Sequence, residues 1–354
     1  MTKLGIASII LNIDVYKDYP PFLEKLGKIM DVHVFYFQGK PPRNSRLIYH
    51  HVPYKGSITL YNVWKILNNL TPIVKRENVD AIYVLDGIFY EVLGYLLSKK
   101  LRIPLILRLR TNEVKVRSLT SKNKLKFYLW KNLHDFIIKH SNAISCISHE
   151  LLNYVKFITK NKICSKIIYH GVDIDVFKPY WKKLEEKAVL SVNALTGIKG
   201  AYILIGVAKN TYSIKYLVVG RAEQKYLKML PSNLRYMGYI KRAQMPHIYN
   251  KAYLLFMPSL TEGLPDTVLE ALASGLPIIS SNVGELPYII KPEIGWIIPK
   301  YSINAFVKCL KNALLDVDLL IKMGKRAREY VEKNFKWENY VKKTYELIMS
   351  TMSK

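Results

Sequence analysis

The stretch TEGLPDTVLEALASGLP, residues 261–277, predicts a short helix that begins near Pro265 and ends at Gly275. Proline is favoured at the first helical position, and glycine is favoured just past the last one. The amino end of a helix carries unpaired N–H groups and a partial positive charge, so it suits a phosphate. Two acids flank this end, because Glu262 comes before it and Glu270 lies more than a turn inside the helix. The stretch therefore predicts an anion site with a carboxylate on either side.

The residues around this helix alternate between strand-like and helical patterns. Apolar runs typical of buried strands lie at residues 188–192, 214–220, 252–257 and 276–280. Strands that alternate with helices form a parallel sheet with right-handed crossovers. From Ser302 to Met352 no strand-like run occurs and the spacing is helical throughout, which predicts two or three closing helices.

The first half of the chain has the same alternation. Its strand-like runs lie at residues 5–11, 32–37, 81–85, 104–109, 143–148 and 166–170, with helical patterns such as 61–75 and 122–140 between them. We therefore predict an α/β fold of two doubly wound, Rossmann-like domains that join near residue 172. The expected domains are residues 1–172 and 173–334, with a closing helix at 335–354 that packs on the first domain. Sheets of this kind bind ligands beyond the carboxyl ends of their strands, so the sites should line a cleft between the domains.

The two acids suggest which ligand the anion site takes. A carboxylate that faces a vicinal diol accepts a charge-assisted hydrogen bond from each hydroxyl. Two carboxylates beside a phosphate site would hold sugars on either side of a diphosphate, as a nucleotide sugar requires. Taken singly, each acid is more often structural, because a mid-helix glutamate is usually solvated and Glu262 could simply favour the helix dipole. Together with their flanking residues, the two acids favour a nucleotide-sugar site.

These flanking residues resemble a known family. The stretch PSLTEGLPDTVLEALASGLPIISSNVGELPYII, residues 258–290, resembles the donor-site signature of retaining glycosyltransferases of the GT-B fold, specifically glycosyltransferase family 4. Residues 167–179 are similar to the interdomain segment of that family, and residues 198–208 to its lysine-glycine loop. Residues 234–259 are similar to its nucleobase region, and residues 335–348 to its closing helix. In the first half, only residues 142–155 are strongly similar. The resemblance implies a GT-B fold, in which two Rossmann-like domains face a cleft.

The resemblance also implies a role for each matching residue. Lys199 would neutralise the diphosphate, Glu262 would contact hydroxyls of the transferred sugar, and Glu270 would hold the ribose diol of the nucleotide. The other donor-site positions would line the phosphates or meet the base, and they are Gly220, Tyr239, Ile240, Gly263, Leu264, Asp266 and Thr267.

The chain departs from the family pattern at several donor positions. The family usually has an arginine a few residues before the lysine, where this chain has Asn193 and Ala194. We expect Arg221 to supply the missing charge, because preorganised charge stabilises a departing diphosphate. Pro265 stands where a glycine is common and removes one N–H donor. Asp266 adds a negative charge near the phosphates, which is unfavourable unless it caps the helix or meets a sugar hydroxyl.

The first domain departs further from the family. The glycine pair often seen after the first strand is missing, and the histidine often found after the fourth strand is replaced in LILRLRTNEV. The acceptor-side candidates are therefore Asn12, which follows the first strand, and Arg108 and Arg110, which stand in place of that histidine.

The activity that the resemblance implies is retaining transfer of a hexose-type sugar from a nucleoside-diphosphate sugar to an acceptor hydroxyl. The acceptor would be a lipid-linked or cell-surface glycan. The sugar would leave through an oxocarbenium-like state, and the departing phosphate would take the proton of the acceptor, which attacks from the same face. Lys199, Arg221 and the helix end would stabilise the charge on the leaving group. Neither a metal nor a cofactor beyond the donor co-substrate is implied.

The composition suggests partners without choosing among them. A formal net charge of +27 over 354 residues predicts a positive surface that attracts phosphates, anionic lipids or nucleic acid. Three scattered cysteines without a C-x-x-C pair favour a reducing cytoplasm over a disulfide framework or a thiolate zinc site. The apolar window at 81–97 contains Asp86 and Glu91, which a membrane span tolerates poorly, and a buried strand explains the opening apolar run better than a signal peptide. We expect a cytoplasmic protein, with peripheral attachment to the inner face of the cell membrane as a further hypothesis.

Other enzyme classes are weaker interpretations. A metal-dependent glycosyltransferase needs an Asp-x-Asp at a strand end, and residues 173–175 and 316–318 have this spacing. The first lies in a linker, where we expect Asp173 to shape a turn, and the second is expected to cap a helix. No G-x-G-x-x-G follows the first strand, which disfavours a dinucleotide enzyme. The adjacent His50 and His51 would point to opposite faces of a strand, so a metal site there is also disfavoured.

A basic nucleic-acid-binding or polyanion-binding protein on a degenerate GT-B scaffold is the main alternative from another class. It would need aromatic and basic residues interleaved on an exposed face, and residues 122–140 come nearest to this pattern. We interpret this segment instead as an amphipathic helix whose apolar side consists of Leu125, Tyr128, Leu129, Leu133, Phe136 and Ile137. Packing of that side on the helix's own sheet is the favoured interpretation, and contact with an anionic membrane is the alternative. Nucleic acid is therefore not the expected partner.

Overall fold

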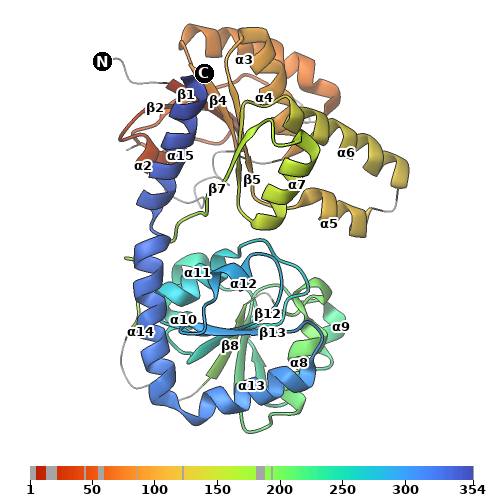
Figure 1. Cartoon of the computed structure of the whole chain (residues 1–354), viewed down its shortest axis with the longest axis vertical. Coiled ribbons are helices and arrows are strands. Elements are labelled where there is room, and N and C mark those ends of the chain that lie inside the picture. The colour runs from red at the N-terminus through yellow and green to blue at the C-terminus, as the bar shows by residue number, and fades with distance from the viewer. Residues whose placement is uncertain are drawn as a thin grey trace. The chain divides into compact units, whose positions relative to one another are not determined.

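The computed structural model describes residues 5–12, 22–43, 45–54, 60–85, 87–121, 123–180, 188–192 and 194–353. The chain divides into two compact units, which are residues 1–170 with 337–354 and residues 171–336 (Figure 1). The sequence placed the domain boundaries at residues 172 and 334. Each unit has its own sheet and core.

The first unit is built on a seven-stranded parallel sheet in the order β3-β2-β1-β4-β5-β6-β7. Its strands are β1 (Gly5–Asn12), β2 (Asp31–Gln38), β3 (Ile48–His51), β4 (Ala81–Val84), β5 (Leu105–Leu109), β6 (Ala143–Cys146) and β7 (Cys164–Ile167). Its helices are α2 (Phe22–Leu26), η1 (Leu60–Asn62), α3 (Val63–Arg76), α4 (Ile88–Leu101), α5 (Glu113–Thr120), α6 (Lys124–Lys139), α7 (His149–Thr159) and α15 (Trp337–Met352). The strand order changes direction between β1 and β4, as in a doubly wound sheet.

The closing helix α15 belongs to the core of the first unit. The Phe22 ring packs against Trp337 and Tyr340, with ring centroids 6.3 and 4.9 Å apart. Further along the helix, Leu347 and Ile348 are fully buried in the same apolar cluster as β1, β2 and β4. This is the packing predicted for the closing helix.

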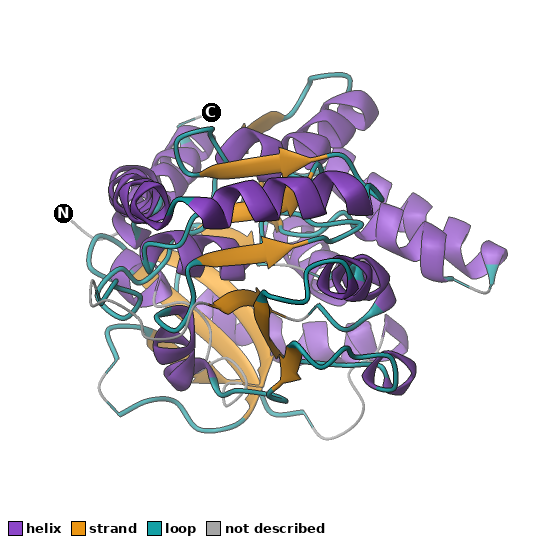
Figure 2. Cartoon of the chain, turned by 90° about the horizontal axis from the view of Figure 1, so that it is seen from below, coloured by secondary structure: helices purple, strands orange, loops and turns teal. Residues whose placement is uncertain are grey.

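The second unit is built on a six-stranded parallel sheet in the order β10-β9-β8-β11-β12-β13. Its strands are β8 (Ala188–Val192), β9 (Lys215–Val219), β10 (Leu234–Tyr236), β11 (Leu254–Met257), β12 (Ile278–Ser281) and β13 (Gly295–Ile298). Its helices are η2 (Gly197–Lys199), α8 (Ala201–Lys209), α9 (Gln224–Leu227), η3 (Arg242–Gln244), α10 (Met245–Tyr249), α11 (Asp266–Ala273), α12 (Leu286–Ile289), α13 (Ile303–Leu315) and α14 (Val317–Asn334). Figure 2 shows strands in orange between helices in purple. The predicted pair of doubly wound parallel sheets is thus confirmed.

Central strands of both sheets are buried along their whole length. Every residue of β4, β5, β6 and β11 is buried. Strands covered by helices on both faces read as continuous apolar runs rather than as alternating ones, which is why these strands were clear in the sequence.

The helix α6 packs through a different side from the one predicted. Leu125, Tyr128 and Leu129 are 71%, 58% and 64% exposed, whereas His134 and Ile138 on the other side are buried. We predicted that the apolar side of this helix packs on its own sheet. That prediction is wrong for most of the side, because these residues are exposed. In its place the helix buries a histidine, which the Glu91 carboxylate of α4 contacts at 2.6 Å.

Two smaller predictions about acids are confirmed. The Asp173 carboxylate accepts hydrogen bonds from the N–H groups of Asp175 and Val176, so it shapes a turn. Asp316 is the N-cap of α14 and accepts a hydrogen bond from the Leu319 N–H.

Among the described residues, no helix is both long enough and apolar enough to cross a membrane.

Candidate functional site

The three predicted catalytic residues follow three neighbouring strands of the second unit. Lys199 lies in η2, after β8, while Arg221 follows β9 and Glu262 follows β11. The strands β9, β8 and β11 are consecutive in the sheet and run parallel. Because the carboxyl ends of parallel strands meet at one edge of the sheet, the three residues share that edge. We call it the donor edge.

The loop that carries Glu262 is held on both sides by backbone contacts. The Leu260 N–H donates to the Ile198 carbonyl oxygen at 3.0 Å, which ties the loop to η2. The Glu285 N–H donates to the Gly263 carbonyl oxygen at 3.1 Å, which ties it to the segment after β12. The fold therefore fixes the position of this loop beside Lys199.

Two glycines permit this close packing. Gly200 has a φ of +78°, and a Cβ atom there would lie 2.0 Å from the Pro258 carbonyl oxygen. Gly284 has a φ of +55°, and a Cβ atom there would lie 2.1 Å from the Glu262 carbonyl oxygen. A residue with a Cβ atom would be strained at this positive φ and would clash with the nearby carbonyl oxygen, so only glycine fits at either position.

Lys199 and Glu262 contact each other directly. Lys199 Nζ lies 2.7 Å from Oε1 and 2.8 Å from Oε2 of Glu262. The Glu262 side chain is 7% exposed, and that of Lys199 is 32% exposed. The residues predicted to meet the sugar and the diphosphate are thus brought together, and the ammonium group is the more accessible of the two.

Glu270 is buried in α11 and has two partners that the sequence analysis missed. Tyr249 Oη donates to Glu270 Oε2 at 2.9 Å, and Arg242 Nη2 lies 3.0 Å from Oε1. Burial raises the pKa of Glu270, while Arg242 and Tyr249 act in the opposite direction. Both partners lie within residues 234–259, the segment similar to the family's nucleobase region, so a signal for them was present in the sequence.

The helix α11 begins at Asp266, one residue later than predicted, and Pro265 is its N-cap. Proline has no side-chain acceptor for the first N–H groups, so Pro265 does not supply the cap that a serine or an aspartate would. Asp266 is exposed and Thr267 is half-buried. Leu264 is buried, with 6% of its surface exposed, so its side chain packs in the protein interior.

The remaining donor-site predictions fall on the loops after β9 and β10. The Gly220 N–H donates to the Gly238 carbonyl oxygen at 2.8 Å, and Tyr236 Oη donates to the Gly220 carbonyl oxygen at 2.7 Å. These contacts join the two loops. Tyr239, on the second loop, is 78% exposed, and Ile240 is half-buried. Arg221 is also exposed on the first loop.

Two predicted site residues, Asn193 and Asn12, lie wholly or partly outside the described residues. Asn193 lies outside the described residues, and so does the side chain of Asn12. The backbone of Asn12 ends β1, where it pairs with Gln38 of β2.

The acceptor-side arginines differ in burial. Arg108 is 3% exposed, and its Nη1 lies 3.1 Å from the Ile168 carbonyl oxygen and 3.4 Å from Ser145 Oγ. Its guanidinium also stacks over the Tyr340 ring at 4.5 Å. These contacts favour a packing role for Arg108 inside the first unit. Arg110, the first residue after β5, is only half-buried.

A histidine pair joins β2 and β3 in the first unit. His33 Nδ1 and His50 Nε2 lie 3.0 Å apart, and Glu77 is near enough for the three residues to offer a metal ion ligand atoms within 4.8 Å of one another. Each group already has a partner in the protein, since the two rings share a hydrogen bond and Glu77 pairs with Arg76 at 2.9 Å. We therefore interpret His33, His50 and Glu77 as a hydrogen-bonded cluster rather than as a metal site.

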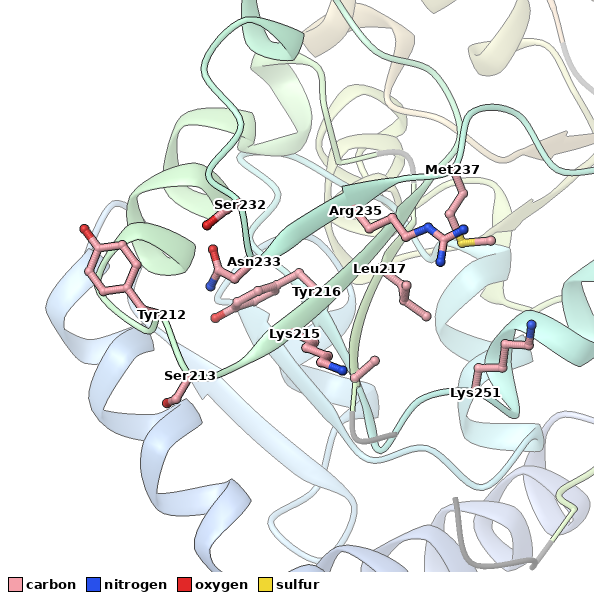
Figure 3. A pocket seen from close by; sticks show the side chains of 11 residues that line it. Tyr212, Ser213, Lys215, Tyr216, Leu217, Ser232, Asn233, Arg235, Met237 and Lys251 are labelled. Atoms are coloured by element: carbon pink, nitrogen blue, oxygen red, sulfur yellow. The ribbon is translucent and has the colours of Figure 1, made fainter. Parts of the chain in front are cut away.

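A pocket of about 720 Å³ lies at the opposite edge of the second sheet (Figure 3). Ala188 and Lys215, the first residues of β8 and β9, line it, together with Arg235 and Lys251. The lining continues along β9 and β10 to Met237, and it does not include Lys199, Arg221 or Glu262. None of the residues that line it is among the predicted site residues.

Residues 173–330 match the family described as Glycosyl transferases group 1. This range holds the whole donor edge. This part of the chain is therefore similar to group 1 glycosyltransferases. The comparisons thus support a glycosyltransferase as the class of protein.

One relative and two solved structures extend the similarity beyond residues 173–330. The capsular polysaccharide biosynthesis glycosyltransferase CapM of Staphylococcus aureus is 24% identical over 93% of this chain and 92% of its own length. Sucrose-phosphate synthase of Thermosynechococcus elongatus has a TM-score of 0.81 at 17% identity, with 99% of this chain and 100% of the other covered. HepE of Anabaena, solved in complex with UDP and glucose, has a TM-score of 0.72 at 15% identity, with 98% and 100% covered. The fold is therefore the GT-B fold that the sequence analysis predicted.

Proposed function

We propose that the protein is a retaining glycosyltransferase of family 4, which moves a hexose-type sugar from a nucleoside-diphosphate sugar to an acceptor hydroxyl without a metal ion. One observation carries the proposal. Lys199 and Glu262 are paired at the donor edge, in front of a helix whose buried Glu270 is the second predicted sugar ligand. A cation, a helix amino end and two carboxylates are the groups that a nucleotide sugar needs.

Each of these groups would act at a different part of the donor. Lys199 and the amino end of α11 would stabilise the charge that develops on the diphosphate as the sugar leaves. Glu262, fixed by Lys199, would accept hydrogen bonds from the sugar hydroxyls. Glu270 would accept them from the ribose diol. The departing phosphate would take the proton of the acceptor hydroxyl, so no protein residue needs to act as the general base.

The donor half of this proposal can be tested with two variants. Thermal-shift screening across nucleotide sugars identifies a donor, because a ligand that binds only the folded protein raises its stability. With that donor at a limiting concentration, Glu270→Ala should abolish transfer and Lys199→Ala should reduce it at least about tenfold. Normal rates in either variant would refute the donor-site assignment. The anomeric configuration of the product and activity in EDTA test retention and metal independence separately.

We propose a lipid-linked or cell-surface glycan as the acceptor, reached while the first unit rests on an anionic membrane. The support comes from α6, where Leu125, Tyr128 and Leu129 form an exposed apolar side and Lys124 and Lys126 are exposed beside it. An apolar stripe with flanking lysines suits the interface of an anionic bilayer. The relative CapM, named for capsular polysaccharide biosynthesis, is consistent with such an acceptor.

Vesicle flotation tests the membrane proposal. The protein should float with vesicles that contain acidic lipid and remain in the dense fraction with zwitterionic ones. Leu129→Glu should weaken flotation, because it places a charge in the apolar side of α6. Leu315→Glu is the matched control, since Leu315 is 83% exposed but lies in the second unit. Flotation that does not depend on acidic lipid, or that Leu129→Glu leaves unchanged, would rule out this surface.

A further inference from the structure

Glu270 combines deep burial with two polar partners from outside its own helix. Its side chain is 7% exposed, whereas that of Arg242 is 47% exposed. Tyr249 is fully buried and binds one carboxylate oxygen, and Arg242 approaches the other from η3. Tyr249 therefore holds the carboxylate from the protein interior, and Arg242 reaches it from the surface.

The other elements around α11 contribute little charge at this point. The strands β11 and β12, which pack against α11, have the sequences LLFM and IISS and carry no charged side chain. On α14, Arg328 donates to the Ala273 carbonyl oxygen and to two further carbonyl oxygens. On α11 itself, Asp266 lies one turn before Glu270 and acts to raise its pKa. Arg242 is thus the cation that offsets both the burial and Asp266.

The charge state of Glu270 decides what it can do for a ribose. An ionised carboxylate accepts hydrogen bonds on both oxygens, whereas a protonated one carries a hydroxyl that donates. Burial favours the protonated form, and a nearby cation favours the ionised one. A buried acid that has to accept two hydrogen bonds from a diol at neutral pH therefore needs a cation beside it.

We propose that Arg242 and Tyr249 are positioning residues for the donor, which act through Glu270. Arg242 keeps the carboxylate ionised, and Tyr249 fixes its orientation toward the ribose diol. This inference rests on the proposed function, since it assumes that Glu270 binds the ribose. It makes Arg242 and Tyr249 determinants of the preference for ribonucleotides over 2′-deoxyribonucleotides.

Calorimetric titration with paired nucleotides tests the inference. The probes are UDP and GDP and their 2′-deoxy forms, titrated between pH 5 and 8. The wild-type protein should prefer one ribonucleotide over its 2′-deoxy form by about tenfold or more, the factor expected for a hydrogen bond to a charged group. This preference should weaken as the pH falls. In Arg242→Gln the preference at pH 7 should fall by about tenfold, and the loss should begin at a higher pH than in the wild type.

Three further variants distinguish positioning from a general loss of structure. Arg242→Lys keeps the charge and should restore most of the ribose preference. Tyr249→Phe should lower the preference less than Arg242→Gln does, and it should shift the pH profile in the same direction by a smaller amount. Arg235→Gln, which removes an exposed arginine of β10 that lines the pocket at the opposite edge, should match the wild type. Glu270→Gln should show a weak preference that does not change with pH.

The possible outcomes separate the two proposals. If the wild-type protein binds neither nucleotide, the proposed function is refuted and this inference with it. If the wild type prefers the ribonucleotide and loses this preference at low pH, but Arg242→Gln behaves in the same way, only this inference is refuted. A 2′-deoxy form that binds the wild type as tightly as its ribonucleotide would also refute it, because Glu270 would then not contact the 2′-hydroxyl.

Discussion

At the scale of the residue, side chains at the donor edge hold one another in place. Lys199 is paired with Glu262, and Glu270 is paired with Arg242. Charges fixed in this way need little reorganisation when charge develops on a ligand, which is the main source of electrostatic catalysis. The backbone beneath Lys199 is fixed by the contact of Gly200 with Pro258.

The substitution Gly200→Ala tests this support for Lys199. The new Cβ atom would lie 2.0 Å from the Pro258 carbonyl oxygen, so the turn that carries Lys199 has to move. We expect the free energy of unfolding to fall by more than about 2 kcal/mol and the nucleotide affinity to fall with it. Denaturant unfolding and titration measure the two effects.

A second glycine provides the control for that prediction. Gly238 has a φ of +73°, close to the +78° of Gly200, but a Cβ atom there would meet nothing within 4 Å. Gly238→Ala should therefore cost only about 1 kcal/mol, from the backbone conformation alone. Equal losses in the two variants would show that the contact with Pro258 does not hold the loop.

The sequence predicts the charged residues of the proposed donor site but not their partners. Glu262, Glu270 and Lys199 lie in short motifs whose spacing is itself the signal. Arg242 and Tyr249 lie more than twenty residues before Glu270, and they meet it only because η3 and α10 fold against α11. A contact made by the tertiary fold leaves no periodic trace in one sequence, so periodicity does not reveal these two residues, and only the similarity of residues 234–259 to the family points to them.

At the scale of the element, the strands that the sequence analysis missed lie at the edges of the sheets. They are β3 in the first unit, and β10 and β13 in the second. An edge strand is covered on fewer sides than a central one, so it can be short and mixed in polarity. β10, for example, has three residues and includes the exposed Arg235. Central strands such as β4 and β11 are apolar throughout, and the sequence predicts both of them.

The helix α6 shows why periodicity predicts a helix better than it predicts which side is buried. The residues that this helix buries are His134, Asp135, Ile137 and Ile138, so the buried side is partly polar. These polar groups are satisfied inside the unit, because His134 contacts Glu91 and Asp135 contacts Lys131 and Tyr154. A pattern that counts only apolar residues cannot detect such a buried polar side.

The His134–Glu91 pair predicts a pH dependence of stability. Burial lowers the pKa of His134, but Glu91 acts with Asp135 and Glu113 to raise it, and the net shift is upward. A histidine with a raised pKa stabilises the fold fully below its unfolded pKa of about 6.5, and this contribution is lost as the pH rises through the folded pKa. The free energy of unfolding should therefore fall as the pH rises above about 6.5. Denaturant unfolding at a series of pH values measures it.

Two variants identify the source of that pH dependence. Glu91→Gln should flatten the decrease, because it removes the charge that keeps His134 protonated. His140→Gln, which changes an exposed histidine at the end of the same helix, should leave the decrease in place. The burial of His33 and His50 lowers their pKa values, so their effects appear below about pH 6.5 and do not overlap this window. A decrease that survives in Glu91→Gln would contradict the assignment.

At the scale of the whole molecule, every described residue of the proposed donor site belongs to the second unit. The family match covers residues 173–330, which lie within the second unit. The positive charge of +27 is a property of the entire chain and does not by itself locate a ligand. An experiment that reports on each unit separately is therefore needed to place the donor.

Hydrogen–deuterium exchange with a bound nucleotide provides that experiment. At 100 times its dissociation constant, a nucleotide that binds only the folded protein stabilises it by about 2.7 kcal/mol, and amide groups near the ligand gain most of the protection. We expect slower exchange in peptides that cover residues 195–200, 220–223 and 259–270, and smaller changes in residues 105–110 and 143–168 of the first unit. Glu270→Ala should remove the effect at the same nucleotide concentration. Protection that is strongest in the first unit would place the nucleotide there and contradict the assignment of the donor edge.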